Sequence, residues 1–378
     1  MSSSPLISIK KAKDAIPGRY IVTFKDSVAH DVGVSSVTDK IDSQSNVTHK
    51  WGFINGLAGA FTDADLELLR SHPDVASIEE DGHVHTQYVK SVTRTDTTWG
   101  LERISSQTSL AGQDPDDLTF TYTYNPTAGT GTDVYIIDTG IFIDHPAFGE
   151  FLKAAPPGEL LCGYKDVDDN GHGTHCAGTA VSGPYGVANA ANVIAVKVLD
   201  ADGISGVDWV RTTAPTTGRP SVASMSLGGD FSTSLNDAVN NLVTAGVTTV
   251  VAAGDENVDA ANSSPASATS VITIGAFDIN DAKAYFSNFG APLAIWGPGV
   301  NVISTWKDGG VKTLSGTSMA TPHVAGFSAY LLCMDTTLTP SSVKSTIQSM
   351  ALKDALSGIP SGTINTMLNN NLGGDDSS

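Results

Sequence analysis

The stretch Leu314-Ser-Gly-Thr-Ser318-Met-Ala-Thr-Pro322-His-Val-Ala-Gly326 places a serine at the start of a run of small and apolar residues. The run predicts a helix that begins near Ser318, because Pro322 is tolerated only in a first turn. A helix N-terminus offers free backbone N–H groups and a positive dipole end, which suit an oxygen that develops negative charge. Taken alone, such a serine is far more often an N-cap than a nucleophile.

A second segment, Asp169-Asn-Gly-His172-Gly-Thr-His175-Cys-Ala-Gly178, surrounds a histidine with small residues. Glycine neighbours let other backbone approach the imidazole, and the residues that follow predict a helix beginning at His172. His172 and His175 have the i, i+3 spacing of a metal-binding pair. No third ligand stands at a metal-site spacing, so we expect no metal here.

A third segment, Ile136-Ile-Asp138-Thr-Gly140, puts a carboxylate at the end of an apolar strand, where open α/β sheets bind ligands. Alone, it is more often a turn or cap residue. The three segments together carry more weight, because a serine nucleophile needs a base and that base needs a carboxylate. The order Asp, His, Ser differs from that of α/β-hydrolases and of chymotrypsin-like enzymes.

The rest of the chain predicts two folded units. From Trp99 onward, β-branched runs that suit strands buried on both faces alternate with helical patterns, which indicates a parallel α/β sheet; the runs are 134–137, 193–199, 222–227, 247–251 and 271–274, with a helix over 234–245. The N-terminal part predicts a small α+β unit with strands at 19–24, 47–53 and 75–79 and helices at 30–43 and 63–69, the second capped by Thr62.

Composition limits the partners and the compartment. The chain has 378 residues and a formal net charge of −19, which repels nucleic acid and anionic membranes. We expect a monomer, with no apolar run long enough to span a bilayer. Three cysteines, and an N-terminus without the features of a secretory signal, predict an intracellular enzyme, cytoplasmic or vacuolar, with an extracellular location as the alternative.

The segments around Asp138, His172 and Ser318 resemble the three signatures of the subtilases, and the chain is most similar to the proteinase K branch. Further marks of that branch are Trp99-Gly-Leu, Ser226-Leu-Gly-Gly229, Ser264-Pro-Ala-Ser267, Phe286-Ser-Asn-Phe-Gly290 and Cys176. Residues 18–86 resemble the inhibitory propeptide of the family. The resemblance implies a subtilisin-like parallel sheet with helices on both faces (92–378), preceded by a ferredoxin-like propeptide (1–91) that is removed by cleavage at about 88–93.

The resemblance also implies a serine endopeptidase, made as a self-processed zymogen, that acts on protein or peptide substrates. Ser318 would attack, His172 would move the proton and Asp138 would orient His172, with the propeptide as intramolecular inhibitor. The substrate would add as a strand along Gly203 to Gly206 and Ser226 to Gly228. The walls of a specificity pocket that admits a large apolar side chain would be Ser226, Leu227, Gly228, Ala252, Ala253 and Gly254.

Two positions depart from the family pattern. Asp255 stands where the family has an oxyanion-binding Asn beside the Ser318 backbone N–H, and removing that amide from subtilisin lowers turnover roughly a hundred- to a thousand-fold. Asp255 can donate only if it stays protonated. The alternative is a catalytically impaired subtilase that binds peptides or inhibitors.

The resemblance implies that catalysis needs no cofactor. Ala294 occupies the position of an expected calcium ligand, which leaves the acidic loop Asp166–Asp169 as another source of oxygen ligands. Thr132 replaces a half-cystine, so Cys176 is expected to be a free thiol near His172.

Overall fold

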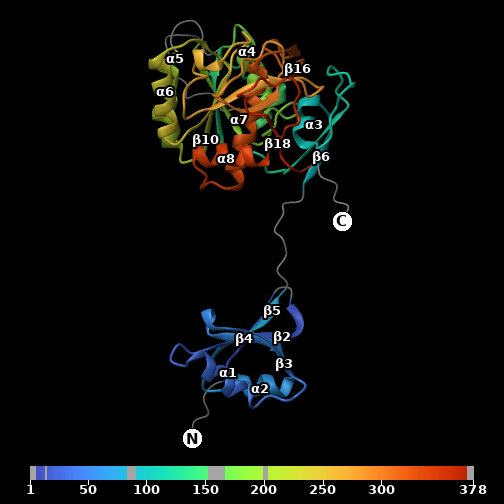
Figure 1. Ribbon diagram of the computed structural model, residues 1–378, viewed down its shortest axis with the longest axis vertical. Helices are drawn as coiled ribbons and strands as arrows, with labels where there is room; N and C mark the ends of the chain where they lie inside the picture. Colours follow the sequence, from blue (N-terminus) through green and yellow to red (C-terminus); the bar gives the residue numbers. More distant parts are fainter. Residues whose placement is uncertain (1–5, 13–14, 83–90, 152–166, 199–202, 373–378) are drawn as a thin grey trace. The chain divides into compact units, whose positions relative to one another are not determined.

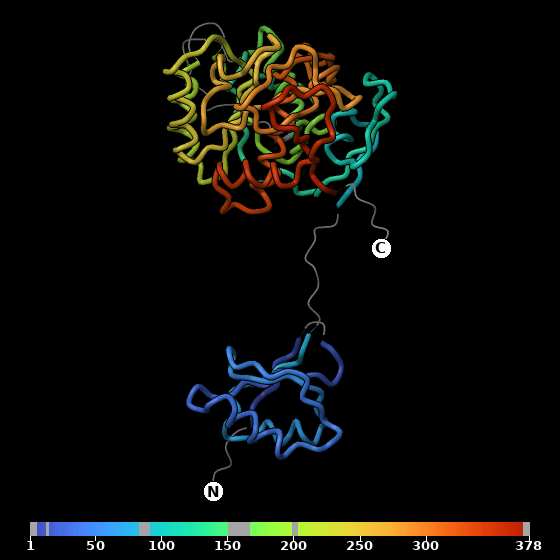
Figure 2. Tube along the Cα trace, viewed as in Figure 1, coloured from blue at the N-terminus to red at the C-terminus, as the bar shows by residue number. Residues whose placement is uncertain are grey.

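The computed structural model describes residues 6–12, 15–82, 91–151, 167–198 and 203–372. The chain divides into two compact units, Met1–Tyr88 and Val89–Ser378 (Figures 1 and 2). The smaller unit is a five-stranded sheet in the order β1-β5-β2-β4-β3, with two helices. Its elements are β1 (Ile9–Lys10), β2 (Ala15–Phe24), α1 (His30–Thr38), β3 (Asn46–Trp51), η1 (Gly52–Ile54), β4 (Gly56–Ala60), α2 (Asp63–Ser71) and β5 (Val75–Gly82).

The smaller unit differs from the sequence prediction in three places, the first of which is the unpredicted short strand β1. The helix predicted for 30–43 ends at Thr38, and Asp42 begins a turn instead, its carboxylate accepting from the Gln44 N–H at 2.8 Å. Strand β4 was not predicted, because Gly-Leu-Ala-Gly-Ala lacks the β-branched residues that indicate a strand. Thr62 caps α2 as predicted, by accepting from the Asp65 N–H.

The larger unit is built on an eight-stranded sheet in the order β18-β19-β15-β14-β12-β10-β8-β9, parallel except for the pair β18–β19. Its strands are β8 (Asp133–Asp138), β9 (Asn192–Lys197), β10 (Ser221–Met225), β12 (Thr248–Ala252), β14 (Ile272–Phe277), β15 (Leu293–Pro298), β18 (Leu352–Lys353) and β19 (Thr366–Met367). The helices are α3 (Trp99–Ser105), α4 (His172–Val181), α5 (Gly203–Thr213), α6 (Thr233–Thr244), α7 (Thr317–Met334) and α8 (Pro340–Met350).

Short elements complete this unit. They are β6 (Val92–Thr97), β7 (Phe120–Tyr124), η2 (Pro146–Phe151), η4 (Ala214–Thr217), β11 (Gly229–Asp230), η5 (Ala260–Asn262), β13 (Ser263–Ser264), β16 (Val302–Thr305) and β17 (Val311–Leu314). Strand β6 pairs antiparallel with β7.

Helices cover both faces of the large sheet. Alternate residues of β8 enter different cores: Val134 and Ile136 pack with α4 and α7, whereas Tyr135 and Ile137 pack with α5 and α6. Figure 1 shows α5 and α6 on one side of the sheet and α7 on the other. The predicted parallel sheet, buried on both faces, is therefore present.

The strand directions bring distant segments to one edge of the sheet. Strands β8, β10 and β12 are parallel neighbours, so their carboxyl ends lie together. Strand β8 ends at Asp138, and β10 ends directly before Ser226. Strand β12 ends three residues before Asp255. Within the described residues, no helix is both long enough and apolar enough to cross a membrane.

Candidate active site

Asp138 and His172 form a hydrogen-bonded pair at this edge. Asp138 is the last residue of β8 and is fully buried, and His172 is the first residue of α4. The His172 Nδ1 atom lies 2.7 Å from Asp138 Oδ1 and 2.9 Å from Oδ2. The carboxylate therefore holds the proton on Nδ1, which leaves Nε2 as the basic nitrogen.

Two glycines allow this close approach. Gly171, the N-cap of α4, has φ of 108°, and a Cβ there would lie 2.5 Å from the Trp306 ring. A Cβ on Gly173 would lie 2.1 Å from the Gly140 carbonyl oxygen. A side chain at Gly173 would push α4 away from the end of β8, and one at Gly171 would collide with Trp306, so both glycines are needed for the observed position of His172.

Ser318 is the second residue of α7, as the sequence predicted, but Pro322 lies beyond the first turn of that helix. Pro322 has no N–H to bond the carbonyl oxygen of Ser318. That oxygen instead accepts from Ser226 Oγ at 2.8 Å and from Cys176 Sγ at 3.5 Å. The proline thus frees a carbonyl that ties the start of α7 to α4 and to the residue after β10.

The Ser318 hydroxyl donates to the Ser226 carbonyl oxygen at 3.1 Å. Rotation about the Cα–Cβ bond of Ser318 turns the hydroxyl away from that carbonyl without moving the backbone. In an enzyme without bound substrate, catalytic hydrogen bonds are often loose and tighten only when the substrate binds.

Electrostatics around His172 favour its protonated form. Burial opposes the charged ring, but the neighbouring Cys176 and Asp138 groups outweigh it and raise the pKa of His172. Because burial also raises the pKa of the Cys176 thiol, the thiol stays neutral and the Asp138 carboxylate is the lasting source of the shift. An imidazolium that forms during a reaction is therefore stabilised.

His175, the other histidine of this segment, has a structural role. Its Nε2 lies 3.0 Å from the carbonyl oxygens of both Val302 and Lys312, and burial lowers its pKa to about 4. The neutral ring fastens the β16–β17 hairpin to α4. A different trio, Asp138, His172 and Cys176, has donor atoms within 4.8 Å of one another and could bind a thiophilic cation.

Sequence reasoning missed the group that fixes the loop before α4. Both oxygens of the buried Asp168 carboxylate accept hydrogen bonds, Oδ1 from Thr139 Oγ1 and the Gly171 N–H and Oδ2 from Thr174. The carboxylate therefore acts as an internal turn support and has no oxygen left for calcium. Asp169 pairs with Lys197 at 2.8 Å, and Asp166 lies outside the described residues.

Ala294, at the position expected for a calcium ligand, has no side-chain oxygen. Ala294 is buried in β15, and its carbonyl oxygen accepts from Gln348 Nε2 at 3.0 Å. Cys176 and Cys333 are free among the described residues, and Thr132 is buried with its hydroxyl bonded to the Ala329 carbonyl oxygen.

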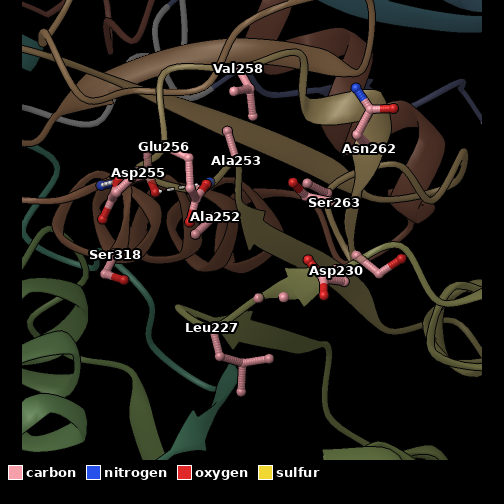
Figure 3. Close-up of a pocket in the computed structure, with 16 residues that line it drawn as sticks. Leu227, Asp230, Ala252, Ala253, Asp255, Glu256, Val258, Asn262, Ser263 and Ser318 are labelled. Atoms are coloured by element: carbon pink, nitrogen blue, oxygen red, sulfur yellow. Dashed lines mark hydrogen bonds between the residues drawn. The ribbon is translucent and has the colours of Figure 1, made fainter.

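Asp255 lies against the start of α7. Its Oδ1 accepts from the Thr317 N–H at 2.8 Å, and its Oδ2 lies 3.0 Å from where a Cβ on Gly316 would stand. Part of the side chain faces the open cavity, yet desolvation by the surrounding protein raises the pKa of Asp255, against hydrogen bonds from Thr317 that lower it. The contact with Thr317 orients the carboxyl and leaves its second oxygen beside Ser318 (Figure 3).

A cavity of about 510 Å³ opens beside Ser318 (Figure 3). Five of the predicted pocket residues line it: Leu227, Gly228, Ala252, Ala253 and Gly254. Ser226 contacts Ser318 but is not part of the lining. Asp255 and Thr317 complete the side next to Ser318.

The other predicted substrate segment has a different structure. Gly203 begins helix α5, and Gly206 is buried against Val198 in the first turns of that helix. A helical segment has no free strand edge, so the prediction that substrate pairs along 203–206 does not agree with the structure. Residues 199–202 lie outside the described residues.

Comparison with known proteins agrees with this geometry. Residues 129–373 match the family described as "Subtilase family", and residues 19–87 match "Peptidase inhibitor I9". The chain is 42% identical to a cuticle-degrading protease of Metarhizium anisopliae, over 95% of this chain and 91% of that one. It is 40% identical to proteinase R of Parengyodontium album, over 98% and 94%.

Solved structures show the same likeness. A cold-adapted subtilisin-like serine proteinase aligns with a TM-score of 0.65 at 38% identity, covering 73% of this chain and 98% of its own.

Proposed function

This chain belongs to the subtilase family, and from that premise we propose that Ser318, His172 and Asp138 carry out its chemistry. The chain is a serine endopeptidase with an inhibitory propeptide, and its fold is subtilisin-like, so the prediction of an α/β serine protease of the proteinase K-like branch is confirmed. No finding favours the alternative of an impaired, peptide-binding subtilase.

In the proposed reaction, His172 Nε2 removes the proton from Ser318 Oγ as that oxygen attacks the substrate carbonyl carbon. The carbonyl oxygen becomes an oxyanion, which the Ser318 backbone N–H and a protonated Asp255 stabilise. His172 then gives the proton to the leaving amine, which departs and leaves an ester on Ser318. Water, activated by His172, hydrolyses the ester and restores the serine.

The observation that carries this proposal is the hydrogen bond between His172 Nδ1 and buried Asp138, at the sheet edge where α7 presents Ser318. The test uses a fluorophosphonate probe, which labels only an activated serine. Wild type is expected to be labelled, Ser318→Ala not at all, and Ser315→Ala, which removes an exposed serine three residues away, as well as wild type. Equal labelling of Ser318→Ala would refute the assignment.

The cavity beside Ser318 is proposed to take the substrate side chain that precedes the scissile bond. It is lined by five of the predicted pocket residues together with Ser318, and a Cβ on Gly229, which also lines it, would meet no atom within 4 Å. Gly203 and Gly206 are not part of this proposal, because they lie in α5.

The zymogen boundary is proposed to lie just before Val92. Val92 and Thr93 are paired with Tyr124 and Thr123, so a bond inside β6 is held in a sheet, where a protease cannot reach it. The inhibitor match ends at residue 87. We therefore place cleavage in the part of the predicted 88–93 region that precedes Val92, with residues 1–91 as propeptide and 92–378 as peptidase.

The prediction of an intracellular location is wrong. Relatives that match over 95–96% of this chain are cuticle-degrading proteases, and a cuticle lies outside the cell that attacks it, so they point to an extracellular location. The prediction rested on an N-terminus without an apolar leader, and such an absence is no observation about location.

Membership of the family supports two partners: the substrates of a protease, and the propeptide as an intramolecular inhibitor. Catalysis in subtilases needs no cofactor in general, and calcium binding is common in the family. We propose that the enzyme acts as a monomer, and that it binds neither nucleic acid nor membrane, because the net charge of −19 of the full chain opposes both surfaces.

A further inference from the structure

The cavity beside Ser318 carries an unexpected number of acids. Among the described residues that line it are Asp230, Asp255 and Glu256, and none is Lys, Arg or His. Figure 3 shows Asp255 and Glu256 near Ser318, and Asp230 beside Ser263 at a different part of the lining. The cavity is identified as the substrate site because Ser318 lines it. The carboxylates are used only to infer which substrate side chain enters the cavity.

The positions of the acids follow from the backbone. Asp230 is in the short strand β11, paired with Ser263 of β13, and both residues line the cavity together with Ala252, the last residue of β12. No ion pair involves Asp230 within the part of the chain that the structure describes. Glu256 Oε2 accepts from Asn288 Nδ2 at 2.8 Å, which fixes the carboxylate without neutralising it.

Most of the remaining lining is small. Gly228, Gly229, Ala252, Ala253 and Ser263 line the cavity, and Leu227 and Val258 are the larger apolar side chains among its described residues. The small residues leave length and volume for an extended side chain. An extended cation can fill such a space with its methylene stem along the alanines and its charged head at a carboxylate.

We propose that this cavity selects a lysine or arginine side chain before the scissile bond, with Asp230 and Glu256 as the specificity-determining residues. The inference rests on the proposed function of the cavity and names its substrate class. Asp230 and Glu256 are exposed carboxylates that line one cavity and have no ion-pair partner among the described residues, so they attract a cation and repel acidic side chains. Asp255 is not counted as a specificity-determining residue, because its proposed role is to stabilise the oxyanion.

The sequence makes a matched control available. Asp237 is an exposed acid of α6 that does not line the cavity, so Asp237→Asn removes the same charge elsewhere. The wild type, Asp230→Asn, Glu256→Gln and Asp237→Asn proteins are each assayed on peptides that differ only at the residue before the scissile bond: Lys, Arg, norleucine, Phe or Glu. Norleucine has nearly the shape of lysine without its charge.

The readout is the ratio of kcat/KM for the Lys peptide to that for the norleucine peptide, which cancels differences in folded fraction. We expect a ratio of roughly ten to a hundred in wild type, a fall of several-fold or more in Asp230→Asn or Glu256→Gln, and no change in Asp237→Asn. Added salt should lower the wild-type ratio. A wild-type ratio near one, or a ratio that falls in neither pocket variant, overturns the inference.

Failure of the proposed function looks different. If Ser318 were not the nucleophile, Ser318→Ala would cleave all five peptides like wild type. If only the specificity inference fails, cleavage still depends on Ser318 and the Phe or norleucine peptide is cleaved as well as the Lys peptide.

Discussion

Replacing Asp255 by Asn should make this enzyme faster, because a carboxyl that donates only when it is protonated becomes an amide that donates at every pH, without disturbing its support. The Thr317 N–H donates to Asp255 Oδ1 at 2.8 Å, and an Asn carbonyl oxygen accepts that bond equally well. The Asn amide nitrogen then takes the place of Oδ2, on the side of the carboxyl that faces the start of α7. The Ser318 backbone N–H then has a second donor beside it whatever the pH.

The size of the gain depends on pH. One oxyanion donor is worth about a hundred- to a thousand-fold in kcat, roughly 2.7–4 kcal/mol, a magnitude measured on subtilisin of the same family. Desolvation raises the pKa of Asp255, so the wild type has a neutral donor below that pKa and a repelling carboxylate above it. The ratio of variant to wild-type kcat should therefore start near one in acid and rise to about a hundred or more as Asp255 ionises.

The thermal stability of Asp255→Asn relative to wild type should also increase as the pH rises. An acid whose pKa is raised on folding stabilises the folded state below its unfolded pKa, and that contribution is lost as pH rises through the folded pKa. Asp255→Asn removes this loss, so the variant should unfold at a higher temperature than wild type in alkaline buffer, and at nearly the same temperature in acid.

The assay is kcat from about pH 5 to about pH 9, on protein whose active sites have been counted with a fluorophosphonate. Asp237→Asn is the control for loss of one negative charge. Equal kcat for Asp255→Asn and wild type across the whole range would show that residue 255 does not face the oxyanion. A gain that is the same at every pH would show that Asp255 is never a donor.

Three other predictions follow from particular contacts. Mercuric ions should inactivate wild type and Cys333→Ala but not Cys176→Ala, because the Cys176 thiol lies 3.9 Å from His172 Nδ1; inactivation of Cys176→Ala at the wild-type rate would contradict this. Arg103→Met should lower the free energy of unfolding by about 3–5 kcal/mol, because it leaves Asp281, the partner of Arg103 at 2.7 Å, unpaired. Arg211→Met, which breaks an exposed pair, should lower it by less than about 1 kcal/mol. Equal losses in urea titrations of the two variants would refute this prediction. Mass spectrometry of the self-processed protein should find a new N-terminus at or before Val92; a terminus inside β6 would contradict the pairing with β7.

The residues of the proposed triad could be found from the sequence because each occupies a position that local patterns reveal. Asp138 ends a β-branched run, and His172 and Ser318 begin helices flanked by small residues. Parallel strands bring such ends to one edge whatever the loop lengths, so their proximity follows from fold class. For these three residues, the observed strand register gives no information that the sequence pattern did not already contain.

Contacts between distant residues could not be predicted in the same way. Asp168 supports the loop before α4 through hydrogen bonds from both neighbouring segments, and Thr317 meets Asp255 across 62 positions of sequence. The helix at Gly203 was missed because two glycines in four residues disfavour a helix, and packing of Gly206 on Val198 overrides that preference. In each case tertiary contact decides, and no local pattern reports it.

The acids of the cavity link catalysis to specificity. A lysine side chain bound near Glu256 brings a positive charge towards the neighbouring Asp255, and a nearby cation lowers the pKa of a carboxyl. The preferred substrate would then favour the ionised form of Asp255, the form that cannot donate to the oxyanion. The gain in kcat on Asp255→Asn should therefore be larger for a lysine peptide than for a norleucine peptide at a pH where wild-type Asp255 is mostly protonated, while the KM advantage of lysine is kept. Equal gains for the two peptides would mean that the oxyanion position and the specificity pocket act independently, and that the acidity of the cavity has no influence on turnover.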